Sequence, residues 1–426
     1  IIDVANIKPI STATAPKRCC GVARTGTSTS ISVIYISYRI EAKIEITMLQ
    51  LERYIFAQLK EQILPGRVLI LLGARRVGKT SLLKKLSDSF PTESVLALNG
   101  DDQKTLDRLA VKSVDNYRSM LGNVQYLFID EAQNIPDIGL KLKLMVDELP
   151  QVAVIVTGSS MFELSNKLGE PLVGRSYVVQ LFPLAQLEFS AYENLIETDA
   201  RLEQRMVLGS YPELLHLTSE ADKIDYLEGI VNSYLLKDIL AFQGIKKADK
   251  IMDLLRLIAF QLGGEVSLDE LATSLKGISR NTIEAYLDLL TKVFVIYPVR
   301  GFSRNLRKEI SKSNRWYFYD NGIRNALIRN YHSLNLRNDT GQLWENYLMA
   351  ERMKLNAYKK RRVNTYFWRT YDQQEIDLIE ESGTDLVAYE FKWNKTIVKV
   401  PSAWKNNYPD AKFVLVNQKL FGFYYR

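Results

Sequence analysis

The stretch VLILLGARRVGKT, residues 68–80, decides the fold of this chain. Its first five residues are apolar and predict a buried strand, and the rest fits the pattern G-x-x-x-x-G-K-[ST]. Gly73 and Gly78 let the backbone turn and aim successive N–H groups at an anion. Lys79 adds a cation, and Thr80 adds a hydroxyl ligand for Mg²⁺. The order of strand, loop and helix therefore predicts a phosphate-binding loop.

The loop brings nine consecutive residues within reach of the phosphates of a bound nucleotide. These residues are Gly73, Ala74, Arg75, Arg76, Val77, Gly78, Lys79, Thr80 and Ser81. A helical pattern follows the loop, and the positive end of the helix dipole points at the same phosphates.

A second apolar strand, residues 126–129, ends in Asp130 and Glu131. We expect Asp130 to hold the hydration shell of Mg²⁺ and Glu131 to polarise the water that attacks the γ-phosphate. A third apolar strand, residues 152–156, runs into TGSS, where the Ser159 hydroxyl is placed to sense the γ-phosphate. No N-K-x-D motif for reading guanine follows the Asp130 strand, so the pattern favours ATP over GTP.

The motifs GARRVGKT, IDEAQ and TGSS resemble those of prokaryotic AAA+-type ATPases, in particular a group of predicted ATPases with a C-terminal domain of unknown function. Further segments are similar to motifs of that group: LVGR at 172–175, FPL at 182–184 with EF at 188–189, and LGSYPE at 208–213. Ser210 stands where the group has a second glycine. The resemblance covers residues 48–426 and implies ATP and Mg²⁺ as cofactors.

Arg175, the last residue of LVGR, is a candidate arginine finger. Such a residue is supplied by a neighbouring copy of the chain and stabilises charge on the γ-phosphate in the transition state. A surface arginine at a turn remains the alternative. The resemblance therefore leaves open a homo-oligomer in which Arg175 completes the site of the next copy.

Composition bounds the partners and the compartment of the chain. Its 426 residues suffice for two to four domains, and no apolar run approaches the ~20 residues that a membrane helix needs. The formal charge of +7 permits acidic partners. Two basic clusters lie at residues 304–315 and 359–362, and each is either a nucleic-acid footprint or a solvated face. Cysteines occur only at Cys19 and Cys20, which suits a cytoplasmic protein and excludes thiolate zinc sites in the body.

The chain divides into five predicted segments. These are an N-terminal extension (1–47), a P-loop ATPase core (48–190), a helical lid (191–260), a winged helix (261–312) and a restriction-endonuclease-like α/β domain (313–426). The first segment is poor in acids and superficially resembles a transit peptide. Because Met48 immediately precedes a helical pattern, we interpret that segment as translated upstream sequence, and we expect disorder there.

The winged-helix prediction rests on a capped helix near residue 267, a turn at 277–279 and a second helix that leads into an apolar strand. In a DNA reader, Arg280, Asn281 and Glu284 would face the major groove. The helix carries few cations, however, and winged helices also serve as protein-contact modules. Both interpretations stay open.

The last hundred residues carry a second constellation. Asp377, followed by Glu390 and Lys392, resembles the D…E-x-K core of restriction-endonuclease-like nucleases. Asp377 and Glu390 on adjacent strands of one small sheet would share a metal ion, Lys392 would orient water, and Glu345 resembles the extra acid of resolvase-type members. An exposed strand with alternating faces produces the same E-x-K spacing without any activity.

Three hypotheses follow. The first is a Mg²⁺-dependent AAA+-type ATPase that couples its nucleotide state to DNA or to a protein partner. The second is an ATP-regulated DNA nuclease that cuts with Asp377, Glu390 and Lys392. The third, a binding module without activity, would need a damaged loop, and none of the residues at the loop or at Asp130 and Glu131 indicates damage.

Overall fold

The computed structural model describes residues 51–159, 172–235, 239, 248–303 and 314–424. The chain separates into two compact units, Ile1–Thr47 and Met48–Arg426, and all described residues belong to the second. The predicted N-terminal extension, both cysteines and residues 304–312 of the first basic cluster lie outside the described residues. Within the described part, no helix combines the length and the apolar character needed to cross a membrane.

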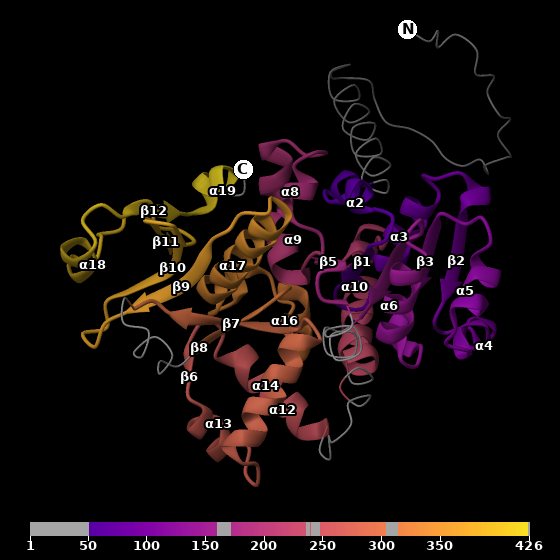
Figure 1. The fold of residues 1–426 in the computed structure, drawn as a ribbon. Coiled ribbons are helices and arrows are strands. Elements are labelled where there is room, and N and C mark those ends of the chain that lie inside the picture. Colours follow the sequence, from indigo (N-terminus) through magenta and orange to yellow (C-terminus); the bar gives the residue numbers. More distant parts are fainter. Residues whose placement is uncertain (1–50, 160–171, 236–238, 240–247, 304–313, 425–426) are drawn as a thin grey trace, which may run out of the picture. The chain divides into compact units, whose positions relative to one another are not determined.

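The first sheet has five parallel strands in the order β2-β3-β4-β1-β5. The strands are β1 (Val68–Leu72), β2 (Val95–Asn99), β3 (Tyr126–Asp130), β4 (Ala153–Gly158) and β5 (Ser176–Gln180). Helices α2 (Phe56–Gln62), α3 (Lys79–Ser87), α4 (Gln103–Ala110), α5 (Val114–Leu121) and α6 (Ile138–Glu148) alternate with them, as Figure 1 shows. Every residue of β1 and β4 is buried, which explains why these strands read as continuous apolar runs. The predicted α/β fold with a parallel sheet is confirmed.

A helical region follows the first sheet. It contains α8 (Gln186–Phe189), α9 (Leu195–Leu208), α10 (Glu220–Gly229), a π-helical segment (Ile230–Leu235) and α12 (Ala248–Phe260). Asn194 caps α9, because its side chain accepts from the backbone of Glu197 and the Glu197 carboxylate accepts from the backbone of Asn194. Helix α16 (Asn321–Ile328), from much later in the chain, packs against α9, α10 and α12.

The second sheet has seven strands in the order β12-β11-β10-β9-β7-β8-β6. They are β6 (Glu265–Val266), β7 (Ile296–Gly301), β8 (Asn314–Phe318), β9 (Asn364–Arg369), β10 (Glu375–Ser382), β11 (Asp385–Phe391) and β12 (Lys412–Val416). The helices of this part are α13 (Leu268–Ser274), α14 (Arg280–Lys292), α17 (Thr340–Tyr358), α18 (Ser402–Asn407) and α19 (Phe421–Tyr424).

The C-terminal acids lie on adjacent strands as predicted, but the sheet that holds these strands is not small, because it has seven strands. Strand β7 pairs with β8 on one edge in antiparallel fashion and with β9 on the other edge in parallel fashion, through Arg300 and Tyr366. One continuous sheet therefore runs across the predicted boundary at residues 312 and 313. A strand has two edges to satisfy, and sequence periodicity reports only its faces.

The LGSYPE segment folds around a buried carboxylate, that of Asp320 at the start of α16. Asp320 accepts hydrogen bonds from the backbone N–H of Ser210 and of Gly322, both at 2.8 Å. Gly209 has a φ of +76°, and a β-carbon there would lie 1.9 Å from Asp320 Oδ1. Burial raises the pKa of Asp320, while the Lys354 ammonium and the backbone donors lower it. Only glycine fits at position 209, which gives this part of the motif a structural role.

We predict that Gly209→Ala destabilises the protein far more than an alanine at another positive-φ glycine. Gly383, in the turn between β10 and β11, is the matched control, because it has a φ of +60° and a β-carbon there would meet open space. Gly383→Ala should cost about 1–2 kcal/mol from backbone strain alone. Gly209→Ala adds the clash with Asp320 and should cost at least about 3 kcal/mol, measured by urea unfolding. Equal losses would contradict this role of Gly209.

Candidate nucleotide site

The phosphate loop connects the end of β1 to the start of α3. A β-carbon on Gly73 would lie 2.2 Å from the backbone oxygen of Leu181, so the loop needs glycine at this point. Gly78 has a φ of +94° and precedes α3, and Arg76 also adopts a left-handed conformation with a φ of +66°. The Lys79 ammonium folds back across the loop and donates to the backbone oxygens of Gly73 at 2.9 Å and Ala74 at 3.0 Å. The loop is therefore a closed turn with its cation held over it.

The strand order places an acid beside this loop. Because β4 lies between β1 and β3, three strands end near Asp130. The Thr80 hydroxyl donates to Asp130 Oδ2 at 2.7 Å, and the Thr157 hydroxyl at the end of β4 donates to Asp130 Oδ1. The structure thus brings the predicted residues Thr80 and Asp130 together and adds Thr157, which the sequence pattern did not single out. The signal for Thr157 is the TGSS motif, in which only Ser159 is expected to act from the pattern alone.

Glu131 is held by its backbone and by its side chain. Its N–H donates to the Thr157 hydroxyl at 3.0 Å, and it has a φ of +48°, which is unusual for glutamate. Its carboxylate accepts from the side-chain amide of Gln133, which also donates to the Ser159 hydroxyl at 3.2 Å. Ser159 therefore lies in the site, buried next to Gln133. Gln133 is a second residue that the sequence pattern did not single out, although it belongs to the IDEAQ motif.

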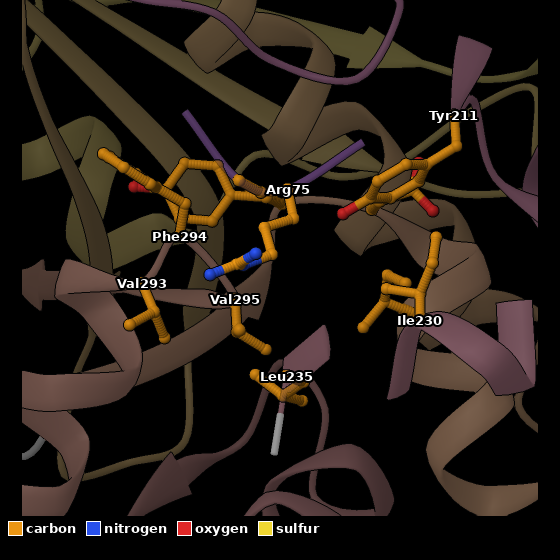
Figure 2. Close-up of a pocket in the computed structure, with 11 residues that line it drawn as sticks. Arg75, Tyr211, Ile230, Leu235, Val293, Phe294 and Val295 are labelled. Atoms are coloured by element: carbon orange, nitrogen blue, oxygen red, sulfur yellow. The ribbon is translucent and has the colours of Figure 1, made fainter. Parts of the chain in front are cut away.

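A pocket with about 420 Å³ of empty space, part of it open to solvent, lies beside the loop (Figure 2). Its lining combines two loop residues with apolar and aromatic residues from later segments: Ala74, Arg75, Tyr211, Ile230, Leu235, Val293, Phe294, Val295, Tyr319, Asp320 and Ile323. Arg75 projects toward Val293 and Val295 in Figure 2. Phe294 has a φ of +60°, a strained conformation for an aromatic residue, directly beside the phosphate loop.

Two of the remaining predicted loop residues are exposed, in agreement with a loop open to a ligand. Arg76 is exposed at the loop, and Ser81 is exposed in the first turn of α3, whereas Val77 is fully buried and anchors the loop. The loop thus exposes side chains at Arg76 and Ser81 on either side of a buried anchor at Val77.

Arg175, the candidate arginine finger, precedes β5, at the end of the first sheet's strands that faces away from the phosphate loop. It precedes Ser176, which pairs with Val68 at the start of β1, so about 16 Å of strand separates it from the phosphate loop. Its guanidinium pairs with Asp147 Oδ1 at 2.5 Å, and its side chain is 41% exposed. Arg175 therefore does not reach the loop of its own chain. A role in the site of a neighbouring copy stays a prediction.

The C-terminal acids lie opposite each other on β10 and β11. The antiparallel register pairs Leu378 with Tyr389 and so places Asp377 across from Glu390. The Lys392 ammonium lies 2.7 Å from Glu390 Oε1 and 3.6 Å from Asp377 Oδ2, which also accepts from the backbone N–H of Phe391 at 2.7 Å. Both acids are buried, whereas 31% of the Lys392 side chain is exposed. The single charge of Lys392 thus faces both carboxylates.

Glu345 on α17 approaches this pair from the side. The Tyr317 hydroxyl donates to Glu345 Oε1 at 2.6 Å, and the Arg315 guanidinium lies 3.7 Å from the same oxygen. Burial, and then the charge of Asp377, raises the pKa of Glu345 to about 8. The same two causes raise the pKa of Glu390 to about 7. Across the described ranges, no group of three or more His, Cys, Asp or Glu side chains is arranged to hold a metal ion.

The basic run at residues 359–362 lies at the far end of α17 from Glu345, and its role as a nucleic-acid footprint stays a prediction. The run follows the end of α17, whereas Glu345 lies in its first turns, and about 20 Å of helix separates them. Arg361 instead lies 3.9 Å from Glu380, which also pairs with Arg352. Arg361 thus contacts the strand that carries Asp377, while α17 separates the run from Glu345.

Comparison with known families divides the chain into three matched regions. Residues 65–190 match an AAA domain. Residues 199–338 match a domain of unknown function (DUF8612), and residues 340–420 match another (DUF4143). The chain therefore contains an AAA domain and a C-terminal DUF4143 domain. The predicted kinship with AAA+-type ATPases that carry a C-terminal domain of unknown function is thereby confirmed.

Relatives occur in bacteria and archaea. An uncharacterized protein of Mycobacterium tuberculosis is 27% identical over 344 residues, which are 80% of this chain and 73% of that protein. An uncharacterized protein of Methanocaldococcus jannaschii is 23% identical over 418 residues, 92% of this chain and 91% of the relative.

Solved structures give weaker likenesses. AMPPCP-bound DnaA from Aquifex aeolicus has a TM-score of 0.26 and 17% identity, over 56% of this chain and 86% of DnaA. A DNA polymerase III gamma subunit-related protein from Thermotoga maritima has a TM-score of 0.25 and 15% identity, over 70% of this chain and 98% of its own. The assignment of the AAA domain stands on the family match.

We predict that Thr157→Val, which keeps the shape of the side chain but removes its hydroxyl, lowers the ATP turnover rate at least about tenfold. Asp130 and the Glu131 backbone would both lose their common partner. Thr198→Val is the matched control. The Thr198 hydroxyl, on α9, is also buried and also donates to a carboxylate, that of Glu193. Equal rates for Thr157→Val and the parent protein would exclude this role of Thr157.

Proposed function

We propose that the AAA domain binds ATP and hydrolyses it in a Mg²⁺-dependent reaction. The observation that carries this proposal is the bridge of Asp130, which accepts hydroxyl hydrogen bonds from Thr80 of the phosphate loop and from Thr157 of the neighbouring strand. A buried carboxylate held against a phosphate loop by two hydroxyls is suited to one task, the organisation of a cation and its water beside the phosphates.

The side chains at this point fit Mg²⁺. Thr80 and Asp130 offer hard oxygen donors 2.7 Å apart, the type that Mg²⁺ prefers. These two residues would hold the ion, which would neutralise charge on the β- and γ-phosphates. Lys79, whose ammonium now contacts two loop carbonyls, would exchange these for phosphate oxygens. The loop N–H groups and the start of α3 supply the remaining donors.

Glu131 is the proposed general base. Its carboxylate is partly exposed, so it can accept a proton from a water molecule in front of the γ-phosphate. Gln133 orients that carboxylate and links it to Ser159, which is our proposed γ-phosphate sensor. When the γ-phosphate leaves, Ser159 loses its contact, and Gln133 passes the resulting shift on to the Glu131 carboxylate. Arg175 of a neighbouring copy is the proposed arginine finger, which requires a homo-oligomer.

We further propose that ATP turnover acts on a DNA or protein partner through a winged helix. The order of α12, β6, α13, α14, β7 and β8 supports this assignment, which begins earlier than residue 261 because it includes α12. Arg280, Asn281 and Glu284 are exposed at the start of α14. Arg280 pairs with Asp269 at 3.3 Å, so its charge is partly compensated, and a protein partner fits this helix as well as DNA does.

We predict that Glu131→Gln retains ATP but blocks its hydrolysis, because the amide keeps the shape and cannot take the proton. Lys79→Ala should lose ATP binding altogether, since it removes the ammonium that faces the β- and γ-phosphates. Phosphate release and ATP titration calorimetry separate the two effects. Turnover at the parental rate in Glu131→Gln would disprove the assignment of Glu131 as the base.

The alternative function is an ATP-regulated DNA nuclease that uses Asp377, Glu390, Lys392 and Glu345. The buried Glu390 Oε2 favours it, because this oxygen has no hydrogen-bond partner among the described residues. Two observations favour a structural role instead. Both acids pair with Lys392, and in the described part no three His, Cys, Asp or Glu side chains are arranged to hold a metal ion.

We predict that the purified protein leaves supercoiled plasmid DNA intact in Mg²⁺ or Mn²⁺, because the Lys392 ammonium already pairs with both acids that would bind the metal ion. Asp377→Ala tests the acid pair, and Asp385→Ala is its control, because Asp385 is an exposed acid at the start of β11. Cleavage that disappears in Asp377→Ala, persists in Asp385→Ala and leaves the ATPase rate unchanged would establish the nuclease instead.

A further inference from the structure

We propose that the DUF4143 domain completes the nucleotide site of the AAA domain through a positioning pair, Arg53 and Tyr358. Arg53 precedes the first sheet, and Tyr358 is the last residue of α17, within the DUF4143 match. Neither residue touches the nucleotide in this proposal. They fix the backbone that does, so the inference rests on the proposed ATP binding and adds the DUF4143 domain as a determinant of affinity.

The Arg53 guanidinium is a junction of three segments. It donates to the backbone oxygen of Val77 at 2.7 Å, to the backbone oxygen of Phe182 at 2.7 Å and to Glu188 Oε1 at 2.8 Å. Its side chain is 9% exposed, and that of Glu188 is fully buried. A buried arginine is retained only where its donors are matched, and here its acceptors lie in the phosphate loop, in the FPL and EF motifs and on Tyr358. The motifs at 182–189 thus hold Arg53 in place.

The bond to Val77 has a direct consequence for phosphate binding. The peptide group between Val77 and Gly78 is planar and trans, so its C=O and N–H point in opposite directions. When Arg53 holds the Val77 oxygen on one side, the Gly78 N–H is turned to the other side, where the loop closes around the phosphates. Gly78 has a φ of +94° and can rotate more freely than other residues, which makes an external anchor valuable.

Tyr358 holds Arg53 from the side of α17. Its hydroxyl oxygen accepts from Arg53 Nη2 at 3.0 Å and from the backbone N–H of Phe182 at 3.2 Å. Its ring stacks on Tyr54, with centroids 6.1 Å apart, and contacts the Phe182 ring at 5.6 Å. Tyr358 is buried, so water cannot replace it as the partner of Arg53 without rearrangement.

Helix α17 cannot shift without moving this pair. The Glu351 carboxylate of α17 accepts from the backbone N–H of Gln186 at 2.5 Å, and the Lys354 ammonium donates to the backbone oxygen of Leu184 at 3.1 Å. Both contacts fall in the segment that carries Glu188. A displacement of α17 by a partner of the DUF4143 domain would therefore reach the phosphate loop through Tyr358 and Arg53, and ATP binding would in turn favour one position of α17.

Tyr358→Phe tests the proposal, because it removes one hydroxyl and keeps the ring. Tyr347→Phe is the matched control: Tyr347 is also buried on α17, and its hydroxyl donates to Gln186 Oε1 at 3.2 Å without contacting Arg53. Titration calorimetry with ATP and Mg²⁺ should give a Kd about three- to tenfold higher for Tyr358→Phe, and a Kd within about twofold of the parent for Tyr347→Phe. The melting temperatures of the two variants should fall by similar amounts.

Steady-state kinetics separates positioning from a general loss of stability. In Tyr358→Phe, KM for ATP should rise with Kd, while kcat stays within about twofold, because Asp130 and Glu131 are untouched. Arg53→Lys should raise KM further, since the single nitrogen of lysine cannot reach the four acceptors that the three guanidinium nitrogens serve.

The outcomes are distinguishable from failure of the proposed function. If the parent protein does not bind ATP, or if Lys79→Ala binds as the parent does, the proposed function falls and the inference falls with it. If the parent binds ATP through Lys79 but Tyr358→Phe and Tyr347→Phe give equal Kd values, the function stands and the role of Tyr358 is refuted.

Discussion

The fold of the AAA domain depends on one carboxylate, that of Asp130, and on the two hydroxyls that bind it. Thr80 follows β1 and Thr157 lies near the end of β4, while Asp130 ends β3, so the bridge exists only if β4 lies between the other two strands. A buried acid without such donors would cost several kcal/mol. The Thr157 hydroxyl also accepts a hydrogen bond from the Glu131 backbone N–H. The strand order of the sheet, the conformation of the loop and the position of Glu131 therefore depend on one another.

The C-terminal half is held by buried polar contacts of its own and by one that ties it to the LGSYPE segment. Strand β7 joins the predicted winged-helix strands to those of the DUF4143 domain, and Asp320 ties α16 to the LGSYPE segment. Buried pairs such as Arg352 with Glu380 are satisfied on several sides and are costly to break singly. A nucleotide-driven movement in this protein is thus expected to shift whole elements as rigid bodies, with the strained turn at Phe294 as one place where the backbone stores strain.

Local sequence patterns predicted the parts of the site that are local. A strand, a glycine-bearing loop and a helix follow one another in residues 68–86, and their chemistry is readable without any distant contact. Thr157, Asp320 and Arg53 were missed because their roles come from partners distant in the sequence: Arg53 and Tyr358 are separated by 305 positions. Gln133 was missed although its partner Glu131 is two positions away, because the motif does not say which way its amide points. The sheet edge shared by β7 and β9 escaped prediction for the same reason, since periodicity indicates which face is buried and not which strand is the neighbour. The spacing of Asp377, Glu390 and Lys392 indicated their proximity, but only the structure shows that the lysine pairs with both acids.

The central claim is that Thr80 and Asp130 form a Mg²⁺ site in which ATP is hydrolysed. The most direct test is phosphate release from ATP by the purified full-length chain, measured while Mg²⁺ is titrated from a chelated start. The account predicts saturable release that is absent in chelator, rises with Mg²⁺ and stays absent when Asp130 is replaced by alanine. Release that proceeds equally well in chelator, or that persists in Asp130→Ala, would contradict it.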